Sequence, residues 1–239
     1  MITQPQAMAT PTPDPDEERR RIQTARLLAY RDDGPLAHVL AGRLGPGLPP
    51  MPATLAALLG VIAVTAIGLP DRGLLLLLPV AIAVLLILPT GPRNHLGRFD
   101  WLTPPLLRAT EFLTMIAIGL AAGAPKWLLF VLVYVVGYHT YDTVYRTRQS
   151  VWPPAWVFQA GLGWELRLLI IGVGAALGIV TPVLAVLTAY LFVLFAVESV
   201  TSWVRLDKAS AQAGADAEQD LEASPEDALE QATGEAEKG

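Results

Sequence analysis

Residues 73–89 read GLLLLLPVAIAVLLILP, a stretch without a charged side chain. As an α-helix they rise about 25 Å, close to the roughly 30 Å thickness of the hydrocarbon core of a bilayer. Five further apolar stretches follow or precede this one, and the six predicted spans are residues 53–69, 73–89, 104–122, 126–145, 166–180 and 183–204. The fifth is short, and we expect its helix to begin nearer Gly163. The sequence therefore predicts an all-α, polytopic membrane protein with six transmembrane helices within residues 53–207.

The composition agrees with that fold class. Hydrophobic residues make up 53% of the chain and charged residues 16%, and the mean hydropathy is +0.44 although both tails are polar. Such values are typical of integral membrane proteins. The first residues are polar and proline-rich, so we expect no cleavable signal peptide and an uncleaved first span. Cysteine is absent, which excludes disulfides, thiolate nucleophiles and zinc–thiolate sites.

Arginine and lysine lie mainly at one end of the predicted helices. That end has Arg43, Arg93, Arg98, Arg146, Arg148, Arg205 and Lys208, whereas the opposite end has only Arg72 and Lys126. Positively charged residues are enriched in cytoplasmic loops, so this bias places both termini in the cytoplasm. We expect a multi-pass protein of the plasma (inner) membrane whose longer, aromatic-rich loops face the cytoplasm.

The segments outside the spans are polar. Residues 1–16 are proline-rich and are predicted to be disordered. Residues 17–52 are predicted to form a cytoplasmic or interfacial helical segment, which is interrupted at Asp32-Asp33-Gly34-Pro35. After this break Leu36, Val39, Leu40 and Leu44 recur at helical spacing, as in an amphipathic helix at the membrane interface. Residues 208–239 are predicted to be a disordered acidic tail, and no basic surface suggests a nucleic-acid partner.

Small residues recur on two of the spans. Gly119 and Gly123 form one GxxxG pair, and Gly174 and Gly178 form another. Such surfaces let helix backbones approach closely. Packing within the bundle is the favoured interpretation, and a homo-oligomer is the alternative.

Polar residues within the spans are spaced as partners. Arg108 and Glu111 are three residues apart, and Asp142 and Arg146 are four apart, so each pair shares one helix face. Further polar residues near the same helix ends are His139, Glu165, Arg167 and Glu198. At 1.5 Å per residue Glu111, His139 and Glu198 each lie roughly 10 Å inside the cytoplasmic helix ends. Because charges facing lipid are costly, we expect these side chains to face inward, around a polar pocket open to the cytoplasm.

Several kinds of chemistry fit this polar pocket, which we take to include Glu111, Glu165 and Glu198. Arg108, Arg146 and Arg167 can hold a phosphate or a lipid headgroup through charge-assisted hydrogen bonds. His139 with Asp142 can act as a catalytic acid–base pair. No cofactor is indicated and no spacing is diagnostic of a metal site, although Glu111, His139 and Glu198 can supply ligands to a divalent cation. Alternatively, all these residues form ion pairs that fix the register of the helices.

Four runs of sequence resemble a known family. They are residues 28–37 (LAYRDDGPLA), residues 48–52 (LPPMP), residues 97–108 (GRFDWLTPPLLR) and residues 163–169 (GWELRLL). They resemble an uncharacterised actinobacterial integral-membrane family that is often fused to, or encoded beside, CDP-alcohol phosphatidyltransferases. The metal-binding pattern of those transferases, D-x2-D-G-x2-A-R followed by D-x3-D, is missing here, so the chain is not a motif-bearing member of the transferase family.

These observations favour an accessory or scaffold subunit in phospholipid headgroup or cell-envelope lipid synthesis. Its expected partners are membrane lipids and a transferase of the lipid pathway. The alternative is a membrane enzyme that transfers or hydrolyses a phosphate-bearing lipid headgroup, and a small-solute transporter is a third hypothesis. No complete catalytic signature decides whether the protein is an enzyme.

Overall fold

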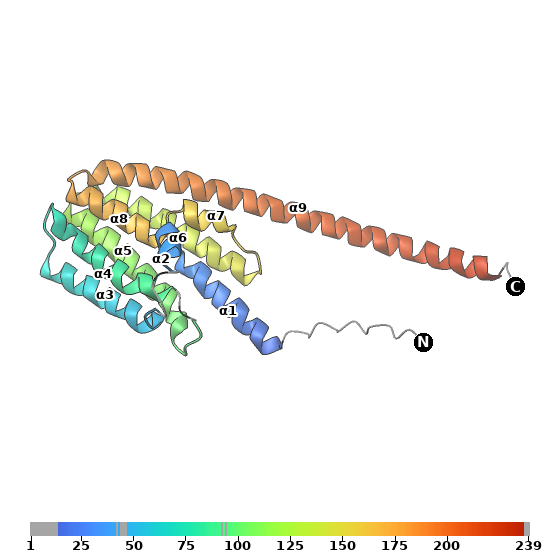
Figure 1. Cartoon of the computed structure of the whole chain (residues 1–239). Coiled ribbons are helices and arrows are strands. Elements are labelled where there is room, and N and C mark those ends of the chain that lie inside the picture. Colours follow the sequence, from blue (N-terminus) through green and yellow to red (C-terminus); the bar gives the residue numbers. More distant parts are fainter. Residues whose placement is uncertain (1–13, 42, 44–46, 92, 94, 237–239) are drawn as a thin grey trace. The chain divides into compact units, whose positions relative to one another are not determined.

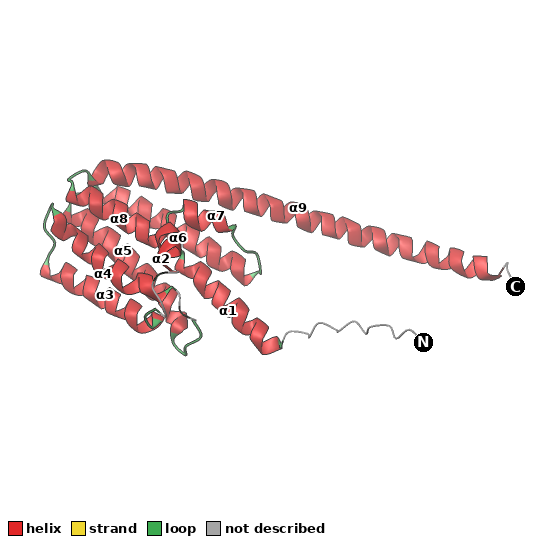
Figure 2. Cartoon of the chain, in the orientation of Figure 1, coloured by secondary structure: helices red, strands yellow, loops and turns green. Residues whose placement is uncertain are grey.

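The computed structural model describes residues 14–41, 43, 47–91, 93 and 95–236 of the chain. It divides into two compact units, Met1–Phe195 and Ala196–Gly239. Every regular element in the described residues is a helix, and Figure 2 shows no strand among them. The all-α fold class predicted from the sequence is therefore confirmed. The tail before Asp14, and Leu44 of the predicted interfacial helix, lie outside the described residues.

The helices follow one another through short connections. In chain order they are α1 (Pro15–Arg31), α2 (Pro35–Ala41), α3 (Pro50–Ile67), the 3-10 turn η1 (Leu74–Leu77), α4 (Leu78–Ile87), η2 (Leu88–Thr90), η3 (Asp100–Leu102), α5 (Thr103–Ala121), α6 (Lys126–Arg148), α7 (Ala155–Ala160), α8 (Gly163–Ala176) and α9 (Val180–Ala236).

The limits of α1 follow from its terminal residues. Its N-cap residue, Asp14, accepts a hydrogen bond from the Asp16 backbone N–H at 3.0 Å, and Pro15 occupies the first helical position. At the other end Asp32 adopts the left-handed conformation, with φ 52° and ψ 48°, and stops the helix. The interruption predicted at Asp32-Asp33-Gly34-Pro35 is therefore present, since α2 begins at Pro35.

In the first unit, α3, α4, α5, α6 and α8 run side by side (Figure 1). Short connections at the α3–η1 and α5–α6 turns make neighbouring helices antiparallel. Their facing side chains form one apolar core, which includes Leu76, Ile87, Met115, Leu132 and Ile171. The helices thus bring the segments around residues 50, 100, 148 and 163 to the same end of the bundle.

Glycines allow some of these helices to touch. A Cβ on Gly119 would lie 2.4 Å from the Leu129 side chain of α6, and one on Gly174 would lie 2.8 Å from Val183 of α9. Both contacts are made within the first unit. Gly119 and Gly174 therefore serve helix packing inside the bundle, as the sequence favoured.

Six membrane spans were predicted, but fewer helices in the described residues are both long enough and apolar enough to cross a membrane. Within the described residues four segments meet both conditions, Pro50–Ile67, Lys126–Arg148, Ala155–Ala176 and Val180–Ala215, and Leu74–Thr90 is a shorter apolar helix. α5 is not among the four, and it carries Arg108 and Glu111 in its first half. The fifth predicted span does start at Gly163, but it reaches a spanning length only together with α7.

The outer surface of the helices is strongly apolar. Ile67, Leu74, Leu85, Phe130 and Val186 are each at least 70% exposed. Large contiguous apolar surfaces are rare on proteins that face water on all sides. This surface and the four long apolar helices are compatible with insertion into a membrane.

The second unit consists of the continuation of α9 from Ala196 to Ala236. The Ser202 hydroxyl donates to Glu198 Oε1 at 2.9 Å within this helix. The helix passes the boundary at residue 208 where the sequence suggested a disordered tail. Alanine and glutamate, which dominate residues 209–236, are both strong helix formers.

Candidate functional site

The turn between α1 and α2, residues 32–34, is anchored inside the helical bundle; we call it the α1–α2 turn. Asp32 is 3% exposed although it carries a carboxylate. Burying a charge is unfavourable unless it is paired and hydrogen-bonded. The partners of this turn therefore define the site.

Four charged side chains from three elements, Asp32 among them, form an ionic network. Arg167 of α8 donates from Nη2 to Asp32 Oδ2 at 2.6 Å and from Nε to Glu111 Oε1 at 2.8 Å. Its third nitrogen, Nη1, donates to the Gly161 carbonyl at 3.0 Å. Arg108 of α5 pairs with Glu111 through Nη1 and donates from Nη2 to the Arg31 carbonyl. We call Asp32, Arg108, Glu111 and Arg167 the ionic network.

Glu165 and Trp164 hold the α1–α2 turn from the start of α8. The Glu165 carboxylate accepts from the backbone N–H of Gly34 at 3.2 Å and of Ala37 at 3.1 Å. The Trp164 backbone N–H donates to the Asp32 carbonyl at 3.3 Å, and its indole N–H donates to Asp33 Oδ1 at 2.9 Å. A buried carboxylate thus satisfies the free N–H groups at the start of α2.

The contact between the turn and α8 is a backbone contact. A Cβ on Gly163 would lie 2.2 Å from the backbone nitrogen of Gly34, and Gly163 has φ +61°. A Cβ on Gly34 would lie 2.4 Å from the Leu162 carbonyl oxygen. Only glycine at both positions allows the two chains to approach this closely.

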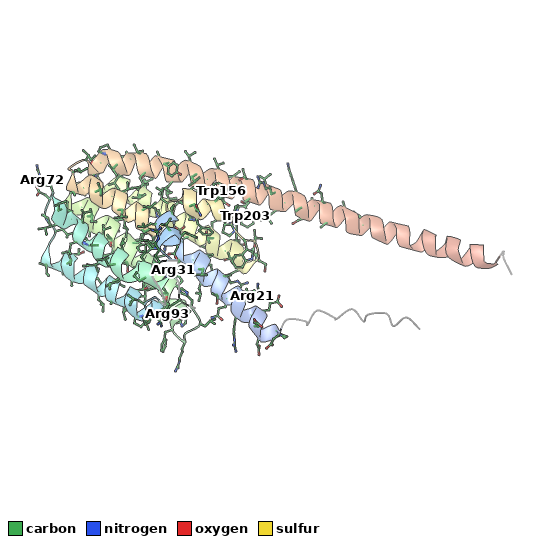
Figure 3. All side chains as sticks on the ribbon, in the orientation of Figure 1. Arg21, Arg31, Arg72, Arg93, Trp156 and Trp203 are labelled. Atoms are coloured by element: carbon green, nitrogen blue, oxygen red, sulfur yellow. The ribbon has the colours of Figure 1, made fainter. Side chains whose placement is uncertain are left out.

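Arg31 and Asp33 form a second ion pair beside the network. Arg31 donates from Nε to Asp33 Oδ2 at 2.9 Å and from Nη1 to the Thr90 hydroxyl at 2.7 Å, and its Nη1 lies 3.4 Å from His95 Nε2. Arg31 is fully buried. Figure 3 shows Arg21 on α1 and Arg72 at the other end of the bundle. Burial alone would raise the pKa of the Asp33 carboxyl, but Arg31 and the Trp164 N–H stabilise the ionised form and lower the pKa below its ordinary value. For His95, burial and then the Arg31 guanidinium lower the pKa.

His139 of α6 lies on the remaining side of Asp32. Its Nε2 is 3.8 Å from Asp32 Oδ1, and neither atom has a hydrogen-bond partner. Its ring stacks on Phe195 with centroids 3.8 Å apart. Burial alone would raise the pKa of Asp32, but Arg167, His139 and Arg108 together hold it well below its ordinary value of 3.8.

The remaining predicted residues occupy several places. Arg146 Nη2 and Asp142 Oδ2 are 2.8 Å apart, so this i,i+4 pair forms as its spacing indicated. Asp142 is therefore paired with Arg146, and its predicted role as the partner of His139 stays a prediction. Glu198 belongs to the second unit. Among the described residues, no three His, Asp or Glu side chains are grouped to hold a metal ion.

The predicted phosphate ligands all have internal partners. Arg108, Arg146 and Arg167 are at most 7% exposed, and carboxylates of the same chain lie against each of them. The structure brings Arg108 and Arg167 together with Glu111. It places Glu165 of α8 against the backbone N–H groups of Gly34 and Ala37. Whether any of these residues binds a headgroup stays a prediction.

Sequence reasoning missed the role of Asp32 and Asp33. It treated Asp32-Asp33-Gly34-Pro35 as a helix breaker, which is correct, and gave the two carboxylates no partner. One signal was present. Arg167 lies in a predicted span without an oppositely charged residue at i±3 or i±4, so a carboxylate from elsewhere in the chain had to compensate it.

Fold and site together define an all-helical protein with apolar helices long enough to cross a membrane and an ionic network buried among them. The chain belongs to a family of unknown function (DUF5941), whose model matches residues 22–220. That range includes the α1–α2 turn and the whole ionic network. Comparisons with curated proteins and with solved structures gave no match.

Proposed function

We propose that the protein is a six-span integral membrane protein of the plasma (inner) membrane with both termini in the cytoplasm. The six crossings are α3, the helical segment from η1 to η2, α5, α6, α8 with α7, and the first part of α9. Arg93, Arg98 and Arg148 lie at the bundle end that carries the α1–α2 turn, whereas Arg72 and Lys126 lie at the other. The positive-inside rule supports a cytoplasmic location for the turn.

Within that membrane the protein acts as an accessory or scaffold subunit of phospholipid headgroup or cell-envelope lipid synthesis. One observation carries this proposal: all three guanidinium nitrogens of Arg167 donate to acceptors of the same chain. Arg108 uses both terminal nitrogens in the same way. Because these guanidinium groups already donate to acceptors of the same chain, they fix the α1–α2 turn in place and have few donors left for a phosphate. The geometry supports a rigid cytoplasmic surface more than an open phosphate clamp.

The pathway rests on the resemblance to an actinobacterial family found beside CDP-alcohol phosphatidyltransferases. The expected partner is such a transferase, docked on the cytoplasmic end. Exposed aromatic side chains there, Trp101 at 59% and Trp156 at 54%, are suitable contacts.

The test is affinity purification from native membranes in a mild detergent, followed by mass spectrometry of retained proteins and lipids. We expect a stoichiometric transferase. The double change Trp101→Ala and Trp156→Ala should reduce its recovery at least about tenfold, because aromatic residues are frequent hot spots. Trp127→Ala is the matched control, since Trp127 is 68% exposed at the opposite end. Recovery of a phospholipid without any transferase would contradict the scaffold.

The alternative function is an enzyme acting on a phosphate-bearing headgroup. It is favoured by the two unsatisfied atoms that face each other, His139 Nε2 and Asp32 Oδ1. His139→Gln separates the proposals: lipid synthesis should persist for a scaffold and fall at least about a hundredfold if His139 is a general acid or base. The expression level and the melting temperature of the His139→Gln variant must match those of the wild-type protein, so that a loss of lipid synthesis is not caused by misfolding. A transporter ranks third, because residues 74–89 are wholly apolar.

A further inference from the structure

A cavity of about 430 Å³ lies beside the α1–α2 turn and outside the ionic network. Its lining comes from α1, the turn, α2, the end of η2, the segment before α7 and α7 itself. The lining residues used below are Leu28, Asp33, His38, Gly91, Trp152 and Phe158. No residue of the predicted polar pocket is among them.

The cavity has the composition of a small-molecule site. Its volume lies within the roughly 300–1,000 Å³ of ligand pockets, which are mostly apolar with a few polar groups. Leu28, Trp152 and Phe158 supply apolar and aromatic walls, and Asp33 and His38 supply polar groups. An occupant must therefore combine an apolar body with a polar end.

Both polar groups accept hydrogen bonds. Asp33 is ionised, because its pKa is lowered by Arg31 and Trp164 despite burial. Three N–H groups occupy its oxygens, and its side chain keeps 16% exposure, so a further donor can reach it. His38 Nδ1 lies 2.8 Å from the Gly34 carbonyl oxygen and must donate to it. In the neutral ring this leaves Nε2 as an acceptor.

The charges favour a neutral occupant. The Arg31 guanidinium compensates Asp33 at 2.9 Å, so a cation finds no uncompensated negative charge there, and an anion would face the carboxylate. Gly91 opens the approach to this pair: a Cβ at this position would lie 3.7 Å from Asp33 Oδ2 and 3.8 Å from Arg31 Nη2. The absent side chain leaves room for a ligand atom above the ion pair.

We propose that this cavity binds a neutral amphiphile whose hydroxyl groups donate to Asp33 and His38 and whose apolar part packs against Leu28, Trp152 and Phe158. A membrane lipid with an uncharged polyol head has this chemistry. The proposal goes beyond the scaffold function and does not depend on it. It also differs in charge from the phosphorylated lipid expected at the arginines.

The test uses photo-crosslinking of the full chain in phosphatidylcholine nanodiscs. The probe is a monoacylglycerol with a diazirine in its acyl chain, and two comparison probes carry the same chain with a trimethylammonium or a phosphate head. Peptide mapping should place the monoacylglycerol label in residues 25–38 and 152–158, at least about tenfold above either comparison probe. Preference for the trimethylammonium or the phosphate head would overturn the proposal, as would labelling confined to other segments.

Gly91→Val fills the space above the ion pair without left-handed strain, because Gly91 has φ −56°. It should reduce monoacylglycerol labelling at least about tenfold. The control, Gly137→Ala, places a Cβ no closer than 4.0 Å to Phe112 and should leave labelling unchanged. His38→Leu removes one acceptor together with the bond from Nδ1 to the Gly34 carbonyl, which still accepts from the backbone N–H of residue 38 at 3.1 Å. The change should bring the monoacylglycerol signal toward that of the comparison probes. Unchanged labelling in both Gly91→Val and His38→Leu would refute the site.

Discussion

Glu111 bridges two guanidinium groups in the interior, at 0% exposure. Removing one partner from a buried charge network leaves the others uncompensated, at a cost of about 3–5 kcal/mol. Glu111→Gln should therefore lower the melting temperature in detergent by roughly 10 °C or more. Glu17→Gln, at an exposed site on α1, should shift it by no more than about 2 °C. Equal shifts for the two variants would show that the network contributes little stability.

Asp32 makes the same network sensitive to acid. Its folded-state pKa lies below the ordinary 3.8, so its ion pairs stabilise the fold above that value and are lost as the pH falls through the folded pKa. At pH 6 Asp32→Asn should be less stable than wild type by about 3–5 kcal/mol. The difference should shrink as the pH is lowered from 5 toward 2.5, followed by thermal unfolding in detergent. A difference independent of pH would mean that the carboxylate charge is not the stabilising feature.

Ion pairs between residues close together on one helix could be predicted from the sequence, and ion pairs between residues far apart in the sequence could not. Arg108 with Glu111 and Asp142 with Arg146 follow from helical spacing alone, and both pairs form. The Arg167–Asp32 pair joins residues 135 positions apart, and no local rule indicates it. The sequence indicates that the charge of Arg167 needs an acidic partner, but it does not indicate which residue that partner is. The identity of the partner depends on how the helices pack.

Among the elements, the α1–α2 turn is held to the start of α8 by the two facing glycines. Gly163→Ala would place a Cβ against the Gly34 backbone and force alanine into φ +61°. Overpacking and left-handed strain together predict a loss of about 2–5 kcal/mol. The measurement is tryptic cleavage after Arg31, which is fully buried in the folded protein and becomes accessible when the turn is released.

Gly137→Ala on α6 is the control for that experiment, because its Cβ would lie no closer than 4.0 Å to Phe112, which is an ordinary contact. It should leave the rate of cleavage after Arg31 at the wild-type value. Slow cleavage in Gly163→Ala would indicate that the turn tolerates a wider separation from α8.

Element boundaries were predictable where special residues mark them. The Asp32-Asp33-Gly34-Pro35 interruption and the start of α8 at Gly163 both coincide with glycine or proline. Apolarity alone was a weaker guide, since α5 falls outside the four long apolar helices because of the charges that the network requires. Helix α9 continues beyond residue 204, where the last predicted span ends, because alanine and glutamate sustain a helix without a core.

For the whole molecule, the proposed topology can be tested on a chain that has no native cysteine. Asp71→Cys and Gln149→Cys place single thiols at exposed positions on opposite ends of the bundle. A membrane-impermeant maleimide should label Asp71→Cys in intact cells and Gln149→Cys only after permeabilisation, with at least about a tenfold difference. Three proposed crossings, the η1–η2 segment, α5 and α6, separate the two positions. Labelling of both from the same side would therefore refute this odd number of crossings, and the reverse pattern would mean that the protein has the opposite orientation.

The distance along the chain between Asp32 and Arg167 has a consequence for biosynthesis. The turn leaves the ribosome well before its partner, and 135 residues take about 7–27 s to synthesise at 5–20 residues per second. During that time Asp32 lacks the Arg167 guanidinium that pairs with it in the folded protein, while α3 to α6 are being synthesised. Closure of the N-terminal segment onto α8 is therefore a late event of assembly. A chain truncated before Arg167 would expose Arg31 to proteases.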